Sequence, residues 1–207
     1  MLGDQMLIFK HFSSCYSSGV EINGKHLGGV GTLVGNVTPH PQLQLATSLQ
    51  ALAVQVSLPK AITLCSIYLP PHATWKEQDL KDLISQLPAP FLLLRDFNAH
   101  SPVWGCKKLD SKGKRLENIL TELDICLLNN KSHTYIHPAS GAQSAIDLSF
   151  CDSSVFLDFE WKVDTDAHDN DHIPVILKSS INQSSDQPNR WTLNRADWDQ
   201  FQSLCSQ

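Results

Sequence analysis

Residues 92–100, Leu-Leu-Leu-Arg-Asp-Phe-Asn-Ala-His, carry an apolar run directly into an acid, an amide and an imidazole. A short apolar run of this kind is typical of a buried strand. At the two-residue period of an extended chain, Asp96 and Asn98 share one face. The stretch therefore predicts a buried strand that delivers a carboxylate and an amide to one small volume at its end.

Two later segments repeat this pattern of polar residues beside short apolar runs. Ser144–Ser149 is a short apolar segment that contains one acid, Asp147, and Asn170-Asp171-His172 directly precedes the apolar run Ile173–Leu177. Hydrolysis of a phosphodiester needs oxygen ligands for a hard cation, a base for the water and donors for the charge that grows on the phosphate. Three strand ends with these side chains are what a divalent-metal phosphoesterase needs.

Taken in order, these motifs resemble the endonuclease/exonuclease/phosphatase family, and more narrowly the endonuclease domain of jockey-type non-LTR retrotransposons. The resemblance covers nearly the whole chain. Arg95–Asn98 matches the family motif Gly-Asp-x-Asn, and Asn98, Ala99, His100, Trp104 and Gly105 match its extension Asn-Ala-His-x-x-x-Trp-Gly. Ile67–Pro70 matches Ile-Tyr-x-Pro and Ile146–Leu148 matches Ile-Asp-Leu. Asn170–His172 matches Ser-Asp-His.

The resemblance implies a fold and a division of the chain. The fold is α/β, a DNase I-like four-layer sandwich of two mixed β-sheets flanked by helices, with its site at the strand ends of one edge. Residues 1–178 form the endonuclease-type domain. Residues 179–207 form a linker, rich in Ser, Asn, Gln and Pro, and the start of a segment that resembles the one leading toward a reverse transcriptase, around Trp191 and Ala196-Asp197-Trp198.

The chain also departs from the family pattern. The family opens with a strand ending in Asn and a second ending in Gln-Glu-Thr, whose Glu is the principal metal ligand, and neither motif occurs in this sequence. We expect the first strands to be lacking, with that Glu a few residues upstream of Met1, which impairs activity and leaves unpaired strand edges. Arg95 replaces the family Gly and Asn170 the family Ser. We expect Arg95 to pair with Asp147 or Asp171 in place of metal.

The resemblance assigns roles to the polar residues. Asp96 prepares the nucleophilic water, Asn98 orients it or holds the phosphate, and Tyr68 donates to a phosphate oxygen. Alone, an Asp-x-Asn after a strand is more often turn chemistry, and Tyr68 alone would be a core or edge aromatic. These alternatives stay open at the level of single residues.

The resemblance likewise assigns the second half of the site. Asp171 pairs with His172 and keeps the imidazole charged and oriented toward the phosphate. Asp171 and Asp147 hold the metal, Mg²⁺ or Mn²⁺. His168 and Asp169, which neighbour this motif, indicate a solvated loop.

Composition limits how the chain could bind DNA. The net charge is −5 and the pI about 5.9, which argues against binding through bulk positive charge. His100 is placed near the DNA groove by the family pattern, although a loop role is the plainer interpretation. One basic cluster either contacts phosphates or forms an ordinary solvated helix start; it comprises Lys107, Lys108, Lys112, Lys114 and Arg115.

Hydrophobic patterning predicts the remaining elements. Strands are expected at 28–34, 52–56, 62–68, 91–94, 125–128, 145–150, 161–163 and 174–177. One helix is expected to be capped by Thr74 and to bury Leu80, Leu83, Ile84 and Leu87, and a second to span Lys112–Leu123. The six cysteines show no CxxC spacing, which favours reduced core residues in a reducing compartment.

The sequence favours one function over two others. The leading hypothesis is a metal-dependent DNA endonuclease domain of a retrotransposon polyprotein, which nicks target DNA for target-primed reverse transcription and has impaired activity. It is expected in the nucleus or cytoplasm, with DNA as partner, a reverse transcriptase domain in the parent polyprotein and no membrane. The alternatives are a catalytically inactive nucleic-acid-binding or interaction module and, with less support, a small-molecule phosphatase.

Overall fold

The computed structural model describes residues 9–22, 25–58, 60–72 and 74–180. The strands are β1 (Phe12–Ile22), β2 (Lys25–Gly35), β3 (Gln42–Leu43), β4 (Gln50–Leu58), β5 (Lys60–Tyr68), β6 (Phe91–Asp96), β7 (Ile125–Leu127), β8 (Tyr135–Ile136), β9 (Gln143–Ser144), β10 (Asp147–Asp152), β11 (Phe159–Val163) and β12 (Val175–Ser179). The helices are α1 (Glu77–Ser85) and α2 (Ser111–Glu122), with 3-10 turns η1 (Pro102–Trp104) and η2 (Ser153–Asp158).

A six-stranded mixed sheet of order β3-β4-β5-β6-β10-β7 forms the centre of the domain. Strands β5 and β6 run parallel, and the other neighbours are antiparallel. Both faces of β6 are covered, which explains why its sequence is a continuous apolar run and not an alternating one. The chain thus brings the carboxyl ends of β5 and β6 and the amino end of β10 to one edge.

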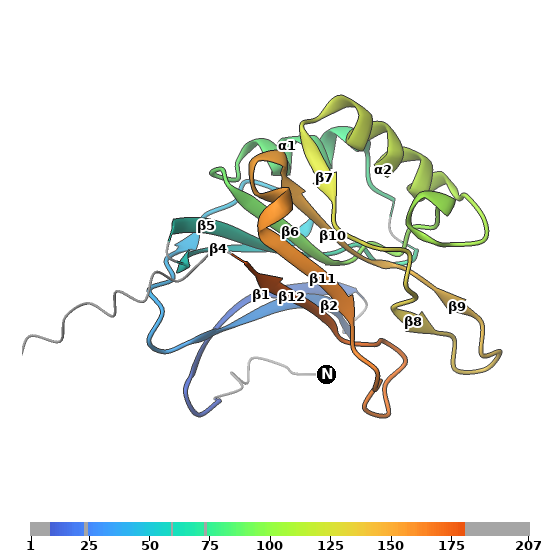
Figure 1. Ribbon diagram of the computed structural model, residues 1–207, viewed down its shortest axis with the longest axis horizontal. Coiled ribbons are helices and arrows are strands. Elements are labelled where there is room, and N and C mark those ends of the chain that lie inside the picture. The colour runs from blue at the N-terminus through green and yellow to red at the C-terminus, as the bar shows by residue number, and fades with distance from the viewer. Residues whose placement is uncertain (1–8, 23–24, 59, 73, 181–207) are drawn as a thin grey trace, which may run out of the picture.

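The two faces of this sheet are covered differently (Figure 1). Helices α1 and α2 pack on one face around the core that contains Leu83, Leu93 and Phe150. The β1–β2 and β11–β12 hairpins cover the opposite face, over a second core that contains Val54 and Trp161. The described residues therefore build a helical layer, the central sheet and a hairpin layer of the expected DNase I-like sandwich.

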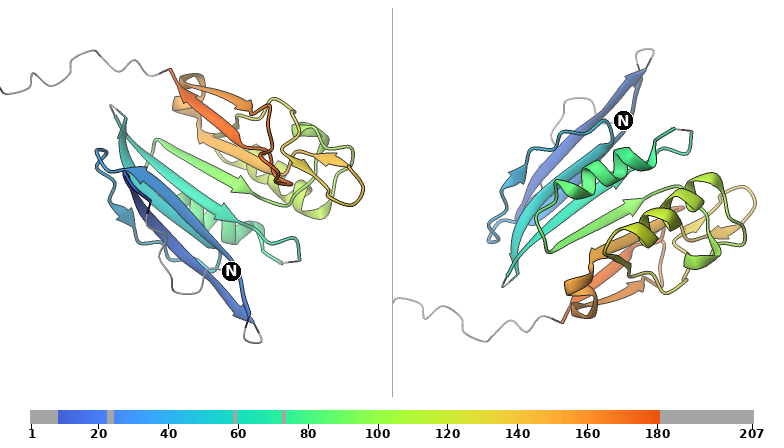
Figure 2. Two further views of the ribbon diagram at one scale, coloured as in Figure 1. Left: turned by 90° about the horizontal axis from the view of Figure 1, so that it is seen from below. Right: turned by 90° about the horizontal axis from the view of Figure 1, so that it is seen from above.

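The hairpin layer is divided. β1–β2 and β11–β12 are separate two-stranded sheets, and no pairing joins them within the described part of the chain. The view from below shows the two hairpins over different parts of the same face of the central sheet (Figure 2). Among the described residues this layer is therefore two antiparallel hairpins and not one mixed sheet, and the expected lack of first strands stays a prediction.

Helix α1 begins later than the sequence predicted. Its N-cap is Lys76 and not Thr74, because the Asp79 carboxylate accepts a hydrogen bond of 2.8 Å from the Lys76 N–H and closes the first turn there. The expected apolar face is present, with Leu80 and Leu83 almost fully buried. Helix α2 lies within a residue of the expected span, and Asp110 caps it by accepting from Gly113 N–H.

The Trp-Gly motif anchors the loop that follows β6. Trp104 is fully buried and its Nε1 donates to the Ala99 carbonyl at 3.1 Å. Gly105 has φ 101°, and a Cβ there would lie 2.5 Å from the Lys131 carbonyl oxygen, so only glycine fits. This motif therefore fixes the path of the chain immediately after Asp96 and Asn98.

The remaining strands and the cysteines agree only in part with the sequence predictions. β1, β3 and the β8–β9 hairpin were not predicted, and β10 begins at Asp147, two residues later than expected. Cys65, Cys106 and Cys151 are free and buried, as predicted for reduced core residues. The domain boundary between residues 178 and 179 stays a prediction, since nearly all of the predicted linker and tail lies outside the described residues. No described helix is long and apolar enough to span a membrane.

Candidate functional site

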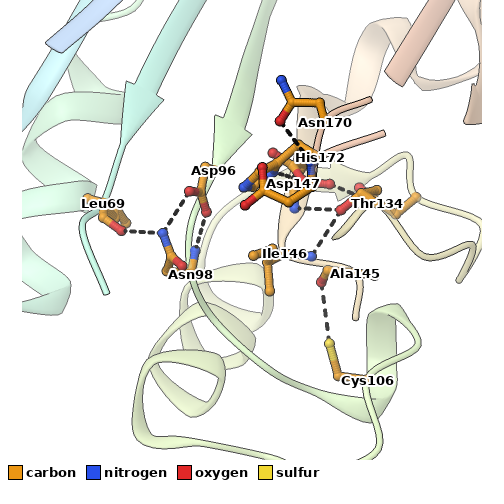
Figure 3. Close-up of polar contacts among 12 residues, drawn as sticks. Leu69, Asp96, Asn98, Cys106, Thr134, Ala145, Ile146, Asp147, Asn170 and His172 are labelled. Carbon is orange, nitrogen blue, oxygen red and sulfur yellow. Dashed lines mark hydrogen bonds and ion pairs between the residues drawn. The ribbon is translucent and has the colours of Figure 1, made fainter. Parts of the chain in front are cut away.

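The pairing of β6 with β10 creates the centre of the candidate site. In this antiparallel register Asp96, the last residue of β6, lies directly opposite Asp147, the first residue of β10. Directly opposed residues have Cβ atoms about 4.5–5.5 Å apart. The two carboxylates therefore belong to one small volume at the edge of the sheet (Figure 3).

Asn98 joins this volume through a turn. Its φ is 45°, so the chain is no longer extended here, and the predicted two-residue strand period is wrong for this pair. The Asn98 N–H donates to Asp96 Oδ1 at 2.9 Å, and Asn98 Nδ2 donates to Asp96 Oδ2 at 2.7 Å and to the Leu69 carbonyl at 3.1 Å. Carboxylate and amide do converge, and they do so by the turn chemistry that the motif alone favoured.

Tyr68 lies at the same edge because β5 ends beside β6. The Leu69 N–H donates to the Asp96 carbonyl at 3.0 Å, which ties the residue after Tyr68 to the end of β6. Burial and the charge of Asp96 raise the pKa of the half-buried Tyr68 phenol. The phenol therefore stays protonated at neutral pH and is available as a hydrogen-bond donor.

His172 pairs with Asp147 and not with Asp171. Its Nδ1 lies 2.9 Å from Asp147 Oδ2, so the predicted Asp171–His172 pair is wrong. The reason is the local backbone: the Asp171 carbonyl accepts from Ile136 N–H at 2.8 Å and the Asp171 N–H donates to Asn170 Oδ1, while β10 brings Asp147 to the imidazole. The hydrogen bond to Asp147 is the main cause that raises the His172 pKa, with Asp96 and Asp171 adding to it and burial opposing it.

The electrostatics of the site favour a cation. Burial, and then the neighbouring Asp147 charge, raise the pKa of Asp96 to about 6, although hydrogen bonds from Asn98 and the charge of His172 counteract this. Burial is the larger cause, and the charge of the neighbouring Asp147 adds to it. A bound cation would stabilise the ionised form of both carboxylates.

Arg95 does not supply the missing charge. Its side chain is exposed and its Nη1 donates to the Gly31 carbonyl at 3.3 Å, so the expected pairing with Asp147 or Asp171 is wrong. The backbone of Arg95 has φ 108°, a conformation that glycine adopts freely and arginine does not. At the position of the family glycine, Arg95 therefore adopts a backbone conformation that favours glycine and strains arginine.

Two members of the basic cluster hold the fold together. Lys112 Nζ donates to the carbonyls of Pro70 and Pro71 at 2.7 and 2.8 Å. Arg115 donates to the Trp75 carbonyl at 2.6 Å and lies over the Trp75 ring. These two cations fasten the start of α2 to the loop that follows Tyr68.

The other candidate DNA-binding residues differ in whether their side chains already bond to another residue of the protein. His100 Nδ1 lies 3.0 Å from Asp110 Oδ2, which ties it to the cap of α2. Lys114 is exposed and forms an ion pair of 3.5 Å with Glu117. Lys107 and Lys108 are exposed, with no hydrogen bond or ion pair to any other residue that the structure describes. Phosphate contact by the cluster stays a prediction.

Two residues of the site were missed by the sequence analysis. Thr134 is fully buried, and its Oγ1 accepts from the N–H groups of Ile146 and Asp147 at 3.2 and 3.0 Å. The ring of Tyr135 lies against the His172 imidazole, with centroids 4.9 Å apart. The run of β-branched and aromatic residues from Thr134 to Ile136 could have indicated a short strand, but no local signal shows what it contacts.

The oxygen donors fit a small hard cation. No group of three or more His, Cys, Asp or Glu side chains is arranged to hold a metal within the described ranges. Asp96 and Asp147 are nevertheless two adjacent carboxylates, and Mg²⁺ characteristically binds proteins through one or two carboxylates and keeps several waters. The donor set therefore suits Mg²⁺ or Mn²⁺ at Asp96 and Asp147, while a ligand role for Asp171 stays a prediction.

Fold and polar edge together define a DNase I-like domain of the endonuclease/exonuclease/phosphatase class. The model of the endonuclease–reverse transcriptase family matches residues 62–176. The chain belongs to this family.

Curated relatives agree with this assignment. The chain is 23% identical over 167 residues to a probable RNA-directed DNA polymerase from transposon X-element of Drosophila melanogaster, which covers 78% of this chain and 18% of that protein. It is 25% identical over 130 residues to the RNA-directed DNA polymerase from mobile element jockey of Drosophila funebris. That match covers 61% of this chain and 14% of the relative. The chain thus spans less than a fifth of the length of these relatives.

Solved structures support the fold. The endonuclease domain of TRAS1, a telomere-specific non-LTR retrotransposon, superimposes with a TM-score of 0.71 at 23% identity, covering 84% of this chain and 83% of that one. An endonuclease/exonuclease/phosphatase family protein from Leptotrichia buccalis C-1013-b gives a TM-score of 0.57 at 14% identity, with 81% and 71% covered. The sandwich predicted from the motifs is confirmed.

Replacing Arg95 with glycine is expected to stabilise the domain by about 1 kcal/mol. Relief of a strained backbone conformation is worth about 1–3 kcal/mol, and this exceeds the roughly 0.5–1 kcal/mol of extra backbone entropy that glycine loses on folding. Arg95→Ala is the matched control, because it removes the guanidinium and keeps the strain. Chemical denaturation should rank Arg95→Gly as the most stable of the three proteins, and a glycine variant less stable than Arg95→Ala would contradict the assignment of strain.

The free energy of unfolding is expected to fall as pH rises between 3.8 and about 6, because folded Asp96 holds a proton that the unfolded chain has already released. His172 also lowers the free energy of unfolding as pH rises, but at higher pH. Its pKa is raised in the folded state, so its contribution to stability is complete below pH 6.5 and is lost as pH rises through the folded pKa. Denaturation midpoints at constant ionic strength measure both effects. Asp96→Asn should flatten the acidic part of the profile, and an unchanged slope in that variant would refute the Asp96 assignment.

Proposed function

We propose that this domain is a divalent-metal-dependent endonuclease that nicks target DNA and exposes a 3′-hydroxyl for target-primed reverse transcription. The observation that carries the proposal is the register of β6 and β10, which sets Asp96 opposite Asp147, with His172 bonded to Asp147. We propose that it works joined to a reverse transcriptase domain, as the names of its relatives suggest.

The residues of the polar edge suit phosphodiester hydrolysis. Asp96, with a pKa of about 6 in the metal-free domain, is largely ionised at neutral pH, so it could hold the ion and position the attacking water. His172, whose pKa the hydrogen bond to Asp147 raises, donates in its protonated form to the charge that develops on the phosphate. Tyr68 donates a further hydrogen bond from its phenol, and Asn98 holds the Asp96 carboxylate in place.

A Mg²⁺ or Mn²⁺ ion at Asp96 and Asp147 would polarise the phosphoryl oxygen and lower the pKa of the attacking water. With two carboxylates as the ligands that the described residues offer, we propose weak ion binding and slow turnover. A third carboxylate, of the kind expected in the family's Gln-Glu-Thr strand, would strengthen the ion site. Asp171 adds negative charge beside His172 and is the remaining candidate ligand.

Nicking of supercoiled plasmid tests the proposal. We expect slow conversion to open circles that requires Mg²⁺ or Mn²⁺, stops on addition of EDTA and is abolished by Asp96→Ala. His172→Ala should lower the rate by about 100-fold, the typical effect of losing a donor to transition-state charge. His100→Ala is the matched control and should change the rate far less, because His100 bonds to Asp110 at the α2 cap. Nicking that survives EDTA, a His172→Ala rate equal to that of the parent, or a parent that is inert with both ions would each overturn the proposal.

DNA binding should depend on Lys107 and Lys108 more than on Lys112. We expect Lys107→Gln with Lys108→Gln to weaken affinity and to reduce the slope of log affinity against log salt by ~0.9 for each lysine that contacts a phosphate. Lys112→Gln should instead lower thermal stability, since it removes the bonds to Pro70 and Pro71. Fluorescence anisotropy over a salt series measures the first effect, and an unchanged slope would assign these lysines to an ordinary solvated surface.

A further inference from the structure

Tyr135 contacts His172 through both its backbone and its ring. The two residues form an isolated antiparallel bridge, flanked by Ile136 N–H to the Asp171 carbonyl at 2.8 Å and Ile173 N–H to the Thr134 carbonyl at 2.7 Å. The phenol and imidazole rings meet with centroids 4.9 Å apart and planes inclined at 56°. The base of the β8–β9 hairpin is therefore built against the loop that carries His172.

Thr134, the residue before Tyr135, contacts Asp147, the hydrogen-bond partner of His172. Thr134 Oγ1 accepts the N–H of Asp147, the residue whose carboxylate bonds to His172. Two consecutive residues thus contact both members of the Asp147–His172 pair, one through a buried hydroxyl and one through an aromatic ring. Figure 3 shows Thr134 beside Asp147 and His172.

The hydrogen bond to Asp147 alone leaves the imidazole free to rotate. A single bond at Nδ1 fixes one ring atom, and the plane of the ring can still swing about that contact. His172 sits in a loop of mostly exposed residues, and about a third of its side chain is exposed. A flat ring packed against the imidazole restricts this swing, and the negative face of a phenol also attracts the protonated form.

We propose that Tyr135 is a positioning residue that sets the plane of the His172 imidazole, and with it the direction of the free nitrogen Nε2. The inference rests on the proposed function, because His172 must meet the phosphate for its orientation to matter. Tyr135 acts through His172 and is not itself required to touch substrate. The ring performs the positioning, so phenylalanine should replace tyrosine at this site and an aliphatic residue should not.

Nuclear magnetic resonance of the ¹⁵N-labelled chain tests the proposal without any cleavage assay. Because Asp147 accepts from Nδ1, the His172 Nδ1–H proton should give a downfield, slowly exchanging signal. We expect this signal, and the ring-current shift of the His172 carbon-bound protons, to persist in Tyr135→Phe and to be lost in Tyr135→Leu. His137→Leu is the matched control, since the His137 ring lies edge-on to the Tyr135 ring, with centroids 6.4 Å apart, and forms no hydrogen bond, ion pair or ring contact with His172.

The outcomes separate this proposal from the proposed function. Tyr135→Leu with unchanged His172 signals, or Tyr135→Phe that loses them, overturns the positioning role. If Tyr135→Leu disturbs the amide signals of the central sheet, Tyr135→Val, which keeps strand propensity, takes its place. Where the parent nicks DNA, Tyr135→Leu should lower kcat on the order of 10- to 100-fold with little change in KM, as expected for a misplaced group. An inert parent would overturn the proposed function and leave the spectroscopic result valid.

Discussion

The antiparallel pairing of β6 with β10 is the constraint on which the site depends. It places Asp96 opposite Asp147, and a slip of one residue would bring a different side chain opposite Asp96 and turn the alternate residues of β10 to the other face. The buried residues Leu93 and Phe150, which face each other in the same ladder, hold the register because a slip would expose one of them. The apolar core thus determines that two carboxylates meet, and the charge of Asp147 adds to burial in raising the pKa of Asp96.

The parts of the fold that could be predicted from sequence are those with a local signal. The apolar runs of β5 and β6 and the helical spacing of α1 and α2 identify these elements without knowledge of their partners. The partner of His172 has no such signal. Asp171 is its neighbour in sequence, but the acid that reaches the imidazole is Asp147, which the register of a distant strand supplies. Pairings of this kind depend on tertiary structure and cannot be read from spacing.

The basic cluster illustrates a second limit of sequence. Five cations after a candidate site suggest a phosphate-binding surface, but a sequence does not distinguish a cation that awaits a ligand from one that already bonds to carbonyl oxygens. Lys112 and Arg115 are of the second kind, since they attach α2 to the loop that follows β5. Lys112 is also close enough to Asp96 for their charges to interact, so a structural cation contributes to the field of the site.

Arg95 shows that the geometry of the edge is imposed by its surroundings. A residue that disfavours positive φ is held at φ 108° because the two residues that follow it are fixed: the Asp96 carbonyl accepts from Leu69 N–H and the Phe97 N–H donates to the Ile146 carbonyl. Strained conformations persist only where such contacts over-determine them. Arginine at the position of the family glycine therefore adopts a backbone conformation that favours glycine, and Asp96 still lies in register with Asp147. The polar edge keeps Asp96, Asp147 and His172 together at a position where the sequence departs from the family motif.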